Sequence, residues 1–498
     1  MNGASSAGLF YLIAGKSPIP SFLISLTQYP RVYAQHLLFQ RPDMELKRQL
    51  GPATGIFVII ADMIGTGIFM TTGVILEATK SALLVLALWG AGGLAAISGA
   101  LCYAELASRW PEAGGEYAYL RNIYGRLPAF LTGWISLVVG FSAPAAVSSL
   151  LLVQYMGRFF HGIAGAGASA FPLDSTLVQK FLAVGLVMFF GAVHMISVKR
   201  GSSLQNALTA IKVVLVLLLI VIGFSQADWS MTRRLTAQYD PAPGARQLVL
   251  QSGLALLVVM YAYSGWNCAA YLGGEIVEPE KNLPRALLSG TAVTAVLYIL
   301  LNVLFLMSAD GASIMGKEEV GAVAASRLFG PGVSAAFTLG IAVVLLSTVS
   351  AQMMAGPRVT YAMARDGLIF RPLAALHQRF HTPYHAILVQ TLLAVFYIFT
   401  GSALTLVIYM GFALSIFPLL AVMGLLRLRH AGRKETGAYR APWHPVLPIV
   451  YSMFTIIAML AALITWTKTS CFAVGVVLLG IPVFYIWDGV SGKREKTS

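Results

Sequence analysis

The chain has 498 residues, of which 57% are hydrophobic and only 11% are charged, and its formal net charge is +14. A soluble domain carries about 25% charged residues, so this composition excludes a soluble globular protein and predicts a membrane protein. The positive charge does not predict nucleic-acid binding, because no basic patch is interleaved with aromatic residues and positive residues commonly flank membrane spans.

Residues 1–43 differ in character from the rest of the chain. They contain four prolines between broken apolar runs, and they lack the basic start and small-residue cleavage site of a signal peptide. We expect a weakly ordered extension, which would not belong to the native protein if translation starts at Met44.

From Met44 onward the chain contains twelve apolar stretches of a length that crosses a bilayer. They lie at residues 53–75, 82–107, 127–156, 176–196, 203–225, 246–273, 284–309, 332–356, 385–401, 403–427, 446–467 and 471–489. The ninth and tenth stretches are separated only by a short turn at Gly401-Ser402. The longest inner connections are residues 108–125 and 357–384, and both are amphipathic.

Lysine and arginine are distributed unequally between alternate connections. With the N-terminus inside and Met44 as the start, the inner segments hold 21 of these residues and the outer segments hold 9. Positive residues are enriched on the cytoplasmic side of membrane proteins. The bias therefore predicts that both termini are cytoplasmic.

The first apolar stretch, residues 53–73, is interrupted by Gly65-Thr66-Gly67. Two glycines flanking a β-branched residue form a poor helix interior, and irregular backbone within a membrane survives only inside protein or beside a wet cavity. The glycines are two residues apart and do not share a helix face, so a simple close-packing motif does not explain them. We expect a helix broken near its middle.

The sixth stretch has the same character, because residues 254–274 are interrupted at Ser264-Gly265. Paired interrupted spans in the two halves of a membrane protein indicate the substrate site of a transporter. Free amides of the half-helix that starts near Gly67 suit a carboxylate. Carbonyls released near Ile64 and around 262–264 suit an ammonium, so the pair of breaks predicts a zwitterionic amino acid as the substrate.

Three sets of motifs resemble the amino acid–polyamine–organocation (APC) superfamily. Residues 63–69 (MIGTGIF) resemble its first-helix motif, and residues 103–106 (YAEL) with 111–117 (PEAGGEY) are similar to its segment after the second helix. Residues 261–267 (YAYSGWN), followed by 275–286 (EIVEPEKNLPRA), look most like the L-type amino acid transporter branch.

This resemblance implies an all-α membrane fold with twelve transmembrane helices. Ten of them would form a LeuT-like 5+5 inverted repeat with helices 1 and 6 broken, and two would be peripheral. The first repeat would occupy residues 44–225, the second 226–427, and the last two helices with the C-terminus 428–498.

The resemblance also implies where the substrate binds. The expected binding residues are Ile64, Gly65, Thr66, Gly67, Tyr261, Ala262, Tyr263, Ser264 and Gly265. Tyr261 would act as an aromatic lid and would gate the site together with Trp266 and Asn267. Ser264 stands where L-type transporters commonly have glycine, so we expect a narrower pocket for small or medium neutral substrates.

Two charged residues lie inside apolar spans, where a charge is expensive and marks function. Lys212 lies within residues 207–223, and the alternative is that it snorkels to the inner surface. By resemblance, its ammonium stands where sodium-coupled relatives hold sodium and bridges helices 1 and 5 near residues 61–65. Lys212 is thus the expected coupling residue, and transport would not need sodium. Asp62 has no firm role, and pairing with Lys212 and proton sensing are both open.

These observations predict a sodium-independent amino acid permease that works by alternating access, as an exchanger of neutral amino acids. Proton-coupled symport, a non-transporting sensor and a channel remain alternatives. An enzyme is not expected, because neither an HExxH nor a GxSxG motif occurs. The histidines and cysteines do not have the spacing of a metal site, and no cofactor is expected.

The expected partners are the amino acid substrate and the lipid bilayer, and not nucleic acid. Residues 158–179, the connection through which L-type animal transporters link to a partner subunit, contain no cysteine, so we expect no disulfide-linked partner. No Asn-x-Ser/Thr sequon occurs, which agrees with a multi-pass protein of a bacterial plasma (inner) membrane.

Overall fold

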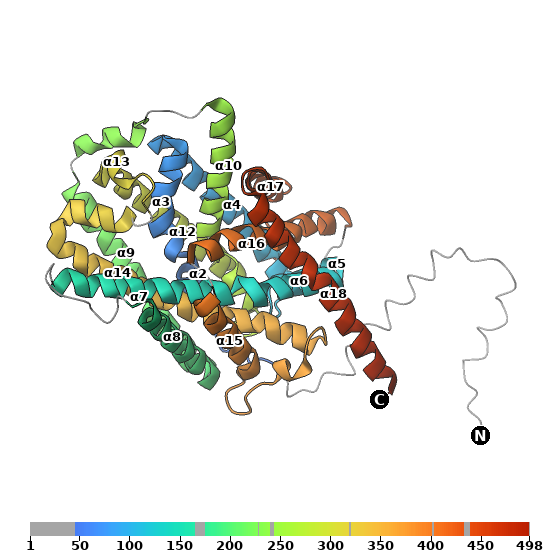
Figure 1. Ribbon diagram of the computed structural model, residues 1–498. Helices are drawn as coiled ribbons and strands as arrows, with labels where there is room; N and C mark the ends of the chain where they lie inside the picture. The colour runs from blue at the N-terminus through green and yellow to red at the C-terminus, as the bar shows by residue number, and fades with distance from the viewer. Residues whose placement is uncertain are drawn as a thin grey trace, which may run out of the picture. The chain divides into compact units, whose positions relative to one another are not determined.

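The computed structural model describes residues 45–164, 175–227, 229–239, 244–317, 320–400, 403–432 and 439–497. The expected extension at 1–43 and the turn at 401–402 lie outside these residues. The described part of the chain is helical apart from its connections and three isolated bridges. The all-α prediction is therefore confirmed (Figure 1).

Eleven helices within the described ranges are long and apolar enough to cross a membrane. The twelfth expected span, at 385–401, corresponds to α15 (Tyr384–Thr400), which is apolar but has only 17 residues. At 1.5 Å per residue such a helix reaches about 26 Å, slightly less than the ~30 Å hydrocarbon core. The chain is thus a multi-pass membrane protein.

The first five spans follow the predicted order, and the first is broken. They are α2 (Pro52–Met63) with α3 (Thr66–Thr79), α4 (Ala82–Arg109), α6 (Arg126–Ile135) with α7 (Ser142–Ala164), α8 (Thr176–Ile196) and α9 (Val198–Gln226). A π-helical turn, η3 (Ser136–Gly140), joins α6 to α7, and the short helix α5 (Glu116–Tyr124) precedes α6. Sequence periodicity gave no sign of the π turn, a feature that often marks functional sites.

The remaining spans begin with a second broken helix. They are α10 (Ala245–Ala262) with α11 (Cys268–Tyr271), α12 (Pro279–Ser308), α14 (Val320–Arg365), α15, α16 (Ala403–His430), α17 (Val446–Thr465) and α18 (Thr467–Thr497). The connections carry η5 (Trp229–Thr236), α13 (Gly311–Ile314) and η6 (Arg371–Ala374). Gly330 interrupts α14 with a φ of +78°, and the part that spans the membrane is Ala335–Arg365.

The prediction of an inner connection over 357–384 is wrong at its start, because α14 continues as helix to Arg365. Arg358 lies in this helical part and is 1% exposed. Its guanidinium makes two hydrogen bonds to the carboxylate of Glu275, with Nε 2.7 Å and Nη2 3.0 Å from the carboxylate oxygens. In the sequence alone, Arg358 resembles a residue of an exposed connection, because the carboxylate that compensates its buried charge lies far away along the chain.

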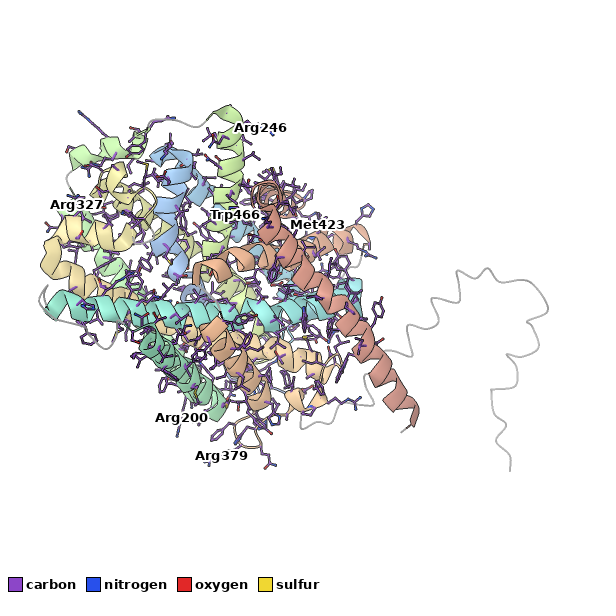
Figure 2. The ribbon with its side chains drawn as sticks, in the orientation of Figure 1. Arg200, Arg246, Arg327, Arg379, Met423 and Trp466 are labelled. Carbon is purple, nitrogen blue, oxygen red and sulfur yellow. The ribbon has the colours of Figure 1, made fainter. Side chains whose placement is uncertain are left out.

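Arginines expected on opposite sides of the membrane lie at opposite ends of the helices. In Figure 2, Arg246 lies at the top, whereas Arg200 and Arg379 lie at the bottom. This separation agrees with the alternation of inner and outer connections.

The two breaks pack against each other. A methyl group on Gly67, in the first turn of α3, would lie 2.7 Å from both Cα and Cβ of Ala262, the last residue of α10. Gly265, within the second break, has a φ of +97°, which disfavours any residue with a side chain. The glycines therefore allow two irregular backbone segments to meet inside the membrane.

We expect Gly67→Ala to destabilise the fold, because overpacking of a tight contact lowers stability by about 1–3 kcal/mol. The measurement is the melting temperature of the detergent-solubilised protein. Gly185→Ala is the matched control, because a methyl group there, in α8, meets nothing within 4 Å. Equal melting temperatures for the two variants would contradict the close approach of the breaks.

Candidate functional site

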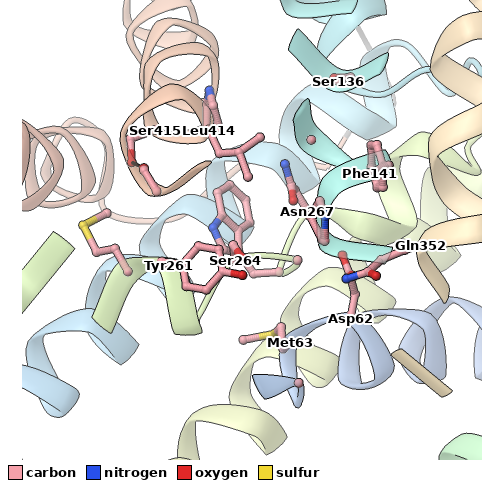
Figure 3. Close-up of a pocket in the computed structure, with 18 of the residues that line it drawn as sticks. Asp62, Met63, Ser136, Phe141, Tyr261, Ser264, Asn267, Gln352, Leu414 and Ser415 are labelled. Carbon is pink, nitrogen blue, oxygen red and sulfur yellow. Dashed lines mark hydrogen bonds between the residues drawn. The ribbon is translucent and has the colours of Figure 1, made fainter. Parts of the chain in front are cut away.

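A cavity of about 110 Å³ lies between the two breaks (Figure 3). Most of the predicted binding and gating residues line it, namely Gly65, Thr66, Gly67, Tyr261, Ala262, Ser264, Gly265, Trp266 and Asn267. Ser136 and Gly140 of the π turn contribute a further wall that the sequence did not indicate. The structure thus brings residues some 200 positions apart into one site.

Ile64 is not among the lining residues, because its carbonyl faces Lys212 instead. Lys212 is completely buried, and its Nζ lies 2.8 Å from Ala61 O, 2.6 Å from Ile64 O and 2.8 Å from Thr348 Oγ1. An ammonium has three N–H donors, so all of them have acceptors. The side chain therefore bridges α9, α2 and α14 and does not snorkel.

Asp62 lies next to this bridge but does not pair with it. Among the described residues, no ion pair joins Lys212 to Asp62 within 4.0 Å. The Asp62 side chain faces the cavity instead, beside Gln352 of α14. Asp62 and Lys212 therefore form no direct ion pair, although their charges lie close enough to interact electrostatically.

Tyr263 also lies away from the cavity. Its hydroxyl donates to Trp89 O at 3.1 Å, and its ring packs at 4.9 Å from the ring of Tyr298 on α12. The Tyr298 hydroxyl lies 2.9 Å from Ala262 O and also bonds Met63 O, so one side chain ties the ends of α2 and α10 together. Sequence reasoning missed Tyr298, because a tyrosine within an apolar span is usually an ordinary core residue.

Glu116, at the start of α5, also lines the cavity. It is 4% exposed, and its Oε1 accepts hydrogen bonds from the Asn267 amide and, at 2.5 Å, from the Tyr271 hydroxyl. Burial raises the pKa of the Glu116 carboxyl to about 7, although its hydrogen-bond donors oppose that shift. The predicted gating residue Asn267 is therefore hydrogen-bonded to a titratable carboxyl group. In the sequence, Glu116 stood out only as a member of the PEAGGEY motif.

The segment before the first broken span is also joined to the segment after the second. Before α2, the amides of Gln49 and Leu50 both donate to Glu275 O at 2.8 Å, and Val277 N donates to Leu50 O at 2.9 Å. The buried Glu275–Arg358 ion pair fixes this junction to α14. Removing one partner of such a pair leaves an uncompensated buried charge and is strongly destabilising.

No metal site accompanies these groups in the described part of the chain, which holds no group of three or more His, Cys, Asp or Glu residues that suits a metal ion. What the cavity offers is hydrogen bonding and charge. It combines carboxylates, hydroxyls and amides with free amides at the start of α3.

Glu116 makes the stability of the folded chain depend on pH. Its folded pKa of about 7 exceeds the ordinary value of 4.5, so the folded state binds the proton more tightly between these values. The free energy of unfolding should therefore fall as the pH rises through that window. Glu116→Gln should remove this slope from melting temperatures in detergent, whereas Glu280→Gln, at an exposed position of α12, should keep it; an unchanged slope in Glu116→Gln would contradict the assignment.

Known proteins resemble the chain over most of its length. The family model described as amino acid permease matches residues 50–481. The serine/threonine exchanger SteT of Bacillus subtilis is 29% identical over 447 residues, which cover 89% of this chain and 97% of that protein. The human b(0,+)-type amino acid transporter 1 is 30% identical over 443 residues, which cover 89% of this chain and 88% of that protein.

A solved structure shows the fold independently of close sequence similarity. The crystal structure of MhsT in complex with L-phenylalanine superposes with a TM-score of 0.61 at 14% identity, over 86% of this chain and 99% of that one. The predicted LeuT-like fold is therefore confirmed. The chain belongs to the amino acid permeases of the APC superfamily, close to the L-type branch, and it transports amino acids and is not an enzyme.

Proposed function

We propose that the permease exchanges neutral amino acids across the plasma membrane, without sodium, by alternating access. The observation that carries the proposal is the cavity between the two breaks. The first amides of α3 suit a substrate carboxylate, because a helix N-terminus attracts anions. Polar acceptors on the other side suit an ammonium, so the site fits a zwitterion, and Ser264 narrows it.

Sodium independence is proposed from the position of Lys212. Its ammonium occupies a set of three oxygen atoms that includes two backbone carbonyls of the first span. Hard cations such as sodium prefer oxygen ligands of this kind, and a fixed positive charge at the same place repels them. The lysine thus provides a permanent positive charge at these oxygen atoms, where a bound cation would provide a reversible one.

Alternating access would move the two broken helices as one unit. The Gly67–Ala262 contact and the Tyr298 hydroxyl join their central segments. The Glu116–Asn267 bond and the backbone pairing before α2 close the inner end. Opening of that end requires these polar contacts to separate, while Tyr261 and Trp266 gate the cavity.

The charge distribution supports cytoplasmic termini and a multi-pass position in the plasma membrane of a bacterium. We expect the protein to work without a disulfide-linked partner, because residues 158–179 contain no cysteine. Proton symport is the second candidate, and one observation favours it: two carboxylates, Asp62 and Glu116, line the cavity.

Uptake into proteoliposomes tests the proposal. Labelled alanine, serine, leucine and arginine are offered separately to empty vesicles, to vesicles preloaded with unlabelled amino acid, and under an inward proton gradient. Stimulation by preloading, equal in sodium and choline media, supports exchange. Stimulation by the proton gradient in empty vesicles supports symport. Substrate binding without any flux would contradict transport and would identify the protein as a sensor.

Lys212→Met should lower the rate of exchange by at least about tenfold. The variant leaves the single hydroxyl of Thr348 as donor for both Ala61 O and Ile64 O, so one of the two carbonyls loses its partner, and an unsatisfied buried acceptor costs about 1–3 kcal/mol. The initial uptake rate per folded protein is the measurement. Lys180→Met, at the start of α8, is the control, and unchanged exchange in Lys212→Met would remove both the coupling role and the argument against sodium.

A further inference from the structure

We propose that Asp62 and Gln352 form a cation subsite within the cavity and that this subsite takes an ammonium group of the transported amino acid. The inference rests on the proposed function for the identity of the ligand. It adds two named recognition residues, one of which lies outside both breaks.

Other side chains already bond several of the backbone carbonyls that the broken helices leave without intrahelical donors. Lys212 Nζ bonds the carbonyls of Ala61 and Ile64, and the Tyr298 hydroxyl lies 2.9 Å from Ala262 O. An ammonium that enters the cavity brings three donors that lose their water. Since unpaired buried charge is unfavourable, the ammonium needs acceptors from side chains.

Asp62 presents such an acceptor. Its side chain is half-buried and lines the cavity, and a methyl group on Gly265 would lie 2.8 Å from Asp62 Oδ2. The carboxylate thus lies against the second break, at the centre of the site. It has no ion-pair partner within 4.0 Å among the described residues. The charge of Lys212 acts on it from a distance, because all three donors of that lysine are engaged elsewhere, and the neutral side chains of Cys268 and Gln352 interact with the carboxylate.

Gln352 supplies an independent observation. Its side chain is 6% exposed and lines the same cavity, yet its Oε1 has no hydrogen-bond partner in the described part of the chain. A buried acceptor without a donor costs about 1–3 kcal/mol. Figure 3 shows Gln352 meeting Asp62 on one side of the cavity, with Tyr261 and Ser264 on the other. A ligand that donates to both oxygens removes this penalty.

The rest of the cavity also favours positive charge. No lysine, arginine or histidine occurs among its described lining residues, whereas Glu116 adds a second carboxylate. The rings of Tyr261 and Trp266 face the same space, and aromatic faces attract cations. The bound group is either the α-ammonium of any amino acid or the cationic end of a dibasic one.

Asp62→Asn tests the subsite and separates these two sources. The KM for uptake of labelled alanine and of labelled lysine is measured in preloaded proteoliposomes, with Glu280→Gln at an exposed position of α12 as the control. A rise of KM by at least about tenfold for both substrates assigns the α-ammonium, and a rise for lysine alone assigns the side chain. Unchanged KM for both overturns the proposal, as does a shift of the pH profile alone.

A second variant and a binding measurement keep the test decisive if Asp62→Asn misfolds or if no flux is detected. Gln352→Met removes the second acceptor and should raise the KM for whichever substrate Asp62→Asn weakens; an unchanged or lowered KM overturns the proposal. Thermal stabilisation of the solubilised protein by alanine and by lysine reads binding without transport. If the protein shows no flux but is stabilised by a substrate, and Asp62→Asn abolishes that stabilisation, the proposed function is refuted and the subsite is supported. If the substrates stabilise the unmodified protein and Asp62→Asn equally, the subsite is refuted.

Discussion

The structure depends on hydrogen bonds to the backbone groups that have no intrahelical partner, at the points where two membrane helices are interrupted. In a bilayer core no water is available to bond a free carbonyl, so each one needs a partner within the protein. Lys212 and Thr348 serve Ala61 O and Ile64 O, and the single hydroxyl of Tyr298 lies within hydrogen-bond reach of the last carbonyls of α2 and α10. The irregular backbone survives because neighbouring helices present donors at these points, and the unused amides of α3 remain for a ligand.

This arrangement explains why the breaks are both rigid and open. Small residues let the two segments approach until a methyl group on Gly67 would meet Ala262 at 2.7 Å. Lys212 and Tyr298, which do not line the cavity, then fix the two segments through hydrogen bonds to their carbonyls. The Asp62 carboxylate and the first residues of α3 line the cavity on the other side.

The breaks themselves were predictable, because glycines near the middle of two apolar spans weaken the helix there and so indicate an interruption. Lys212 was predictable for a related reason, since a lone charge in an apolar run is energetically expensive. Tyr298 and Gln352 were not, because uncharged polar residues are common in spans and only the fold shows which carbonyl or carboxylate they face. Arg358 was misassigned to a connection, because its burial depends on Glu275, 83 residues earlier in the chain.

The two carboxylates of the cavity differ in how they are held, and this difference separates their roles. Glu116 accepts hydrogen bonds from Asn267 and Tyr271, so its charge state is linked to the position of the inner half-helix α11. Asp62 has no ion-pair partner among the described residues, and it lies against Gly265, whose φ of +97° admits a side chain only with strain. Glu116 is therefore placed to stabilise a conformation, whereas Asp62 is placed to meet a ligand. In the proposed alternating-access mechanism, a substrate that bonds Asp62 also contacts the break that moves, so recognition would be linked directly to the opening of the site.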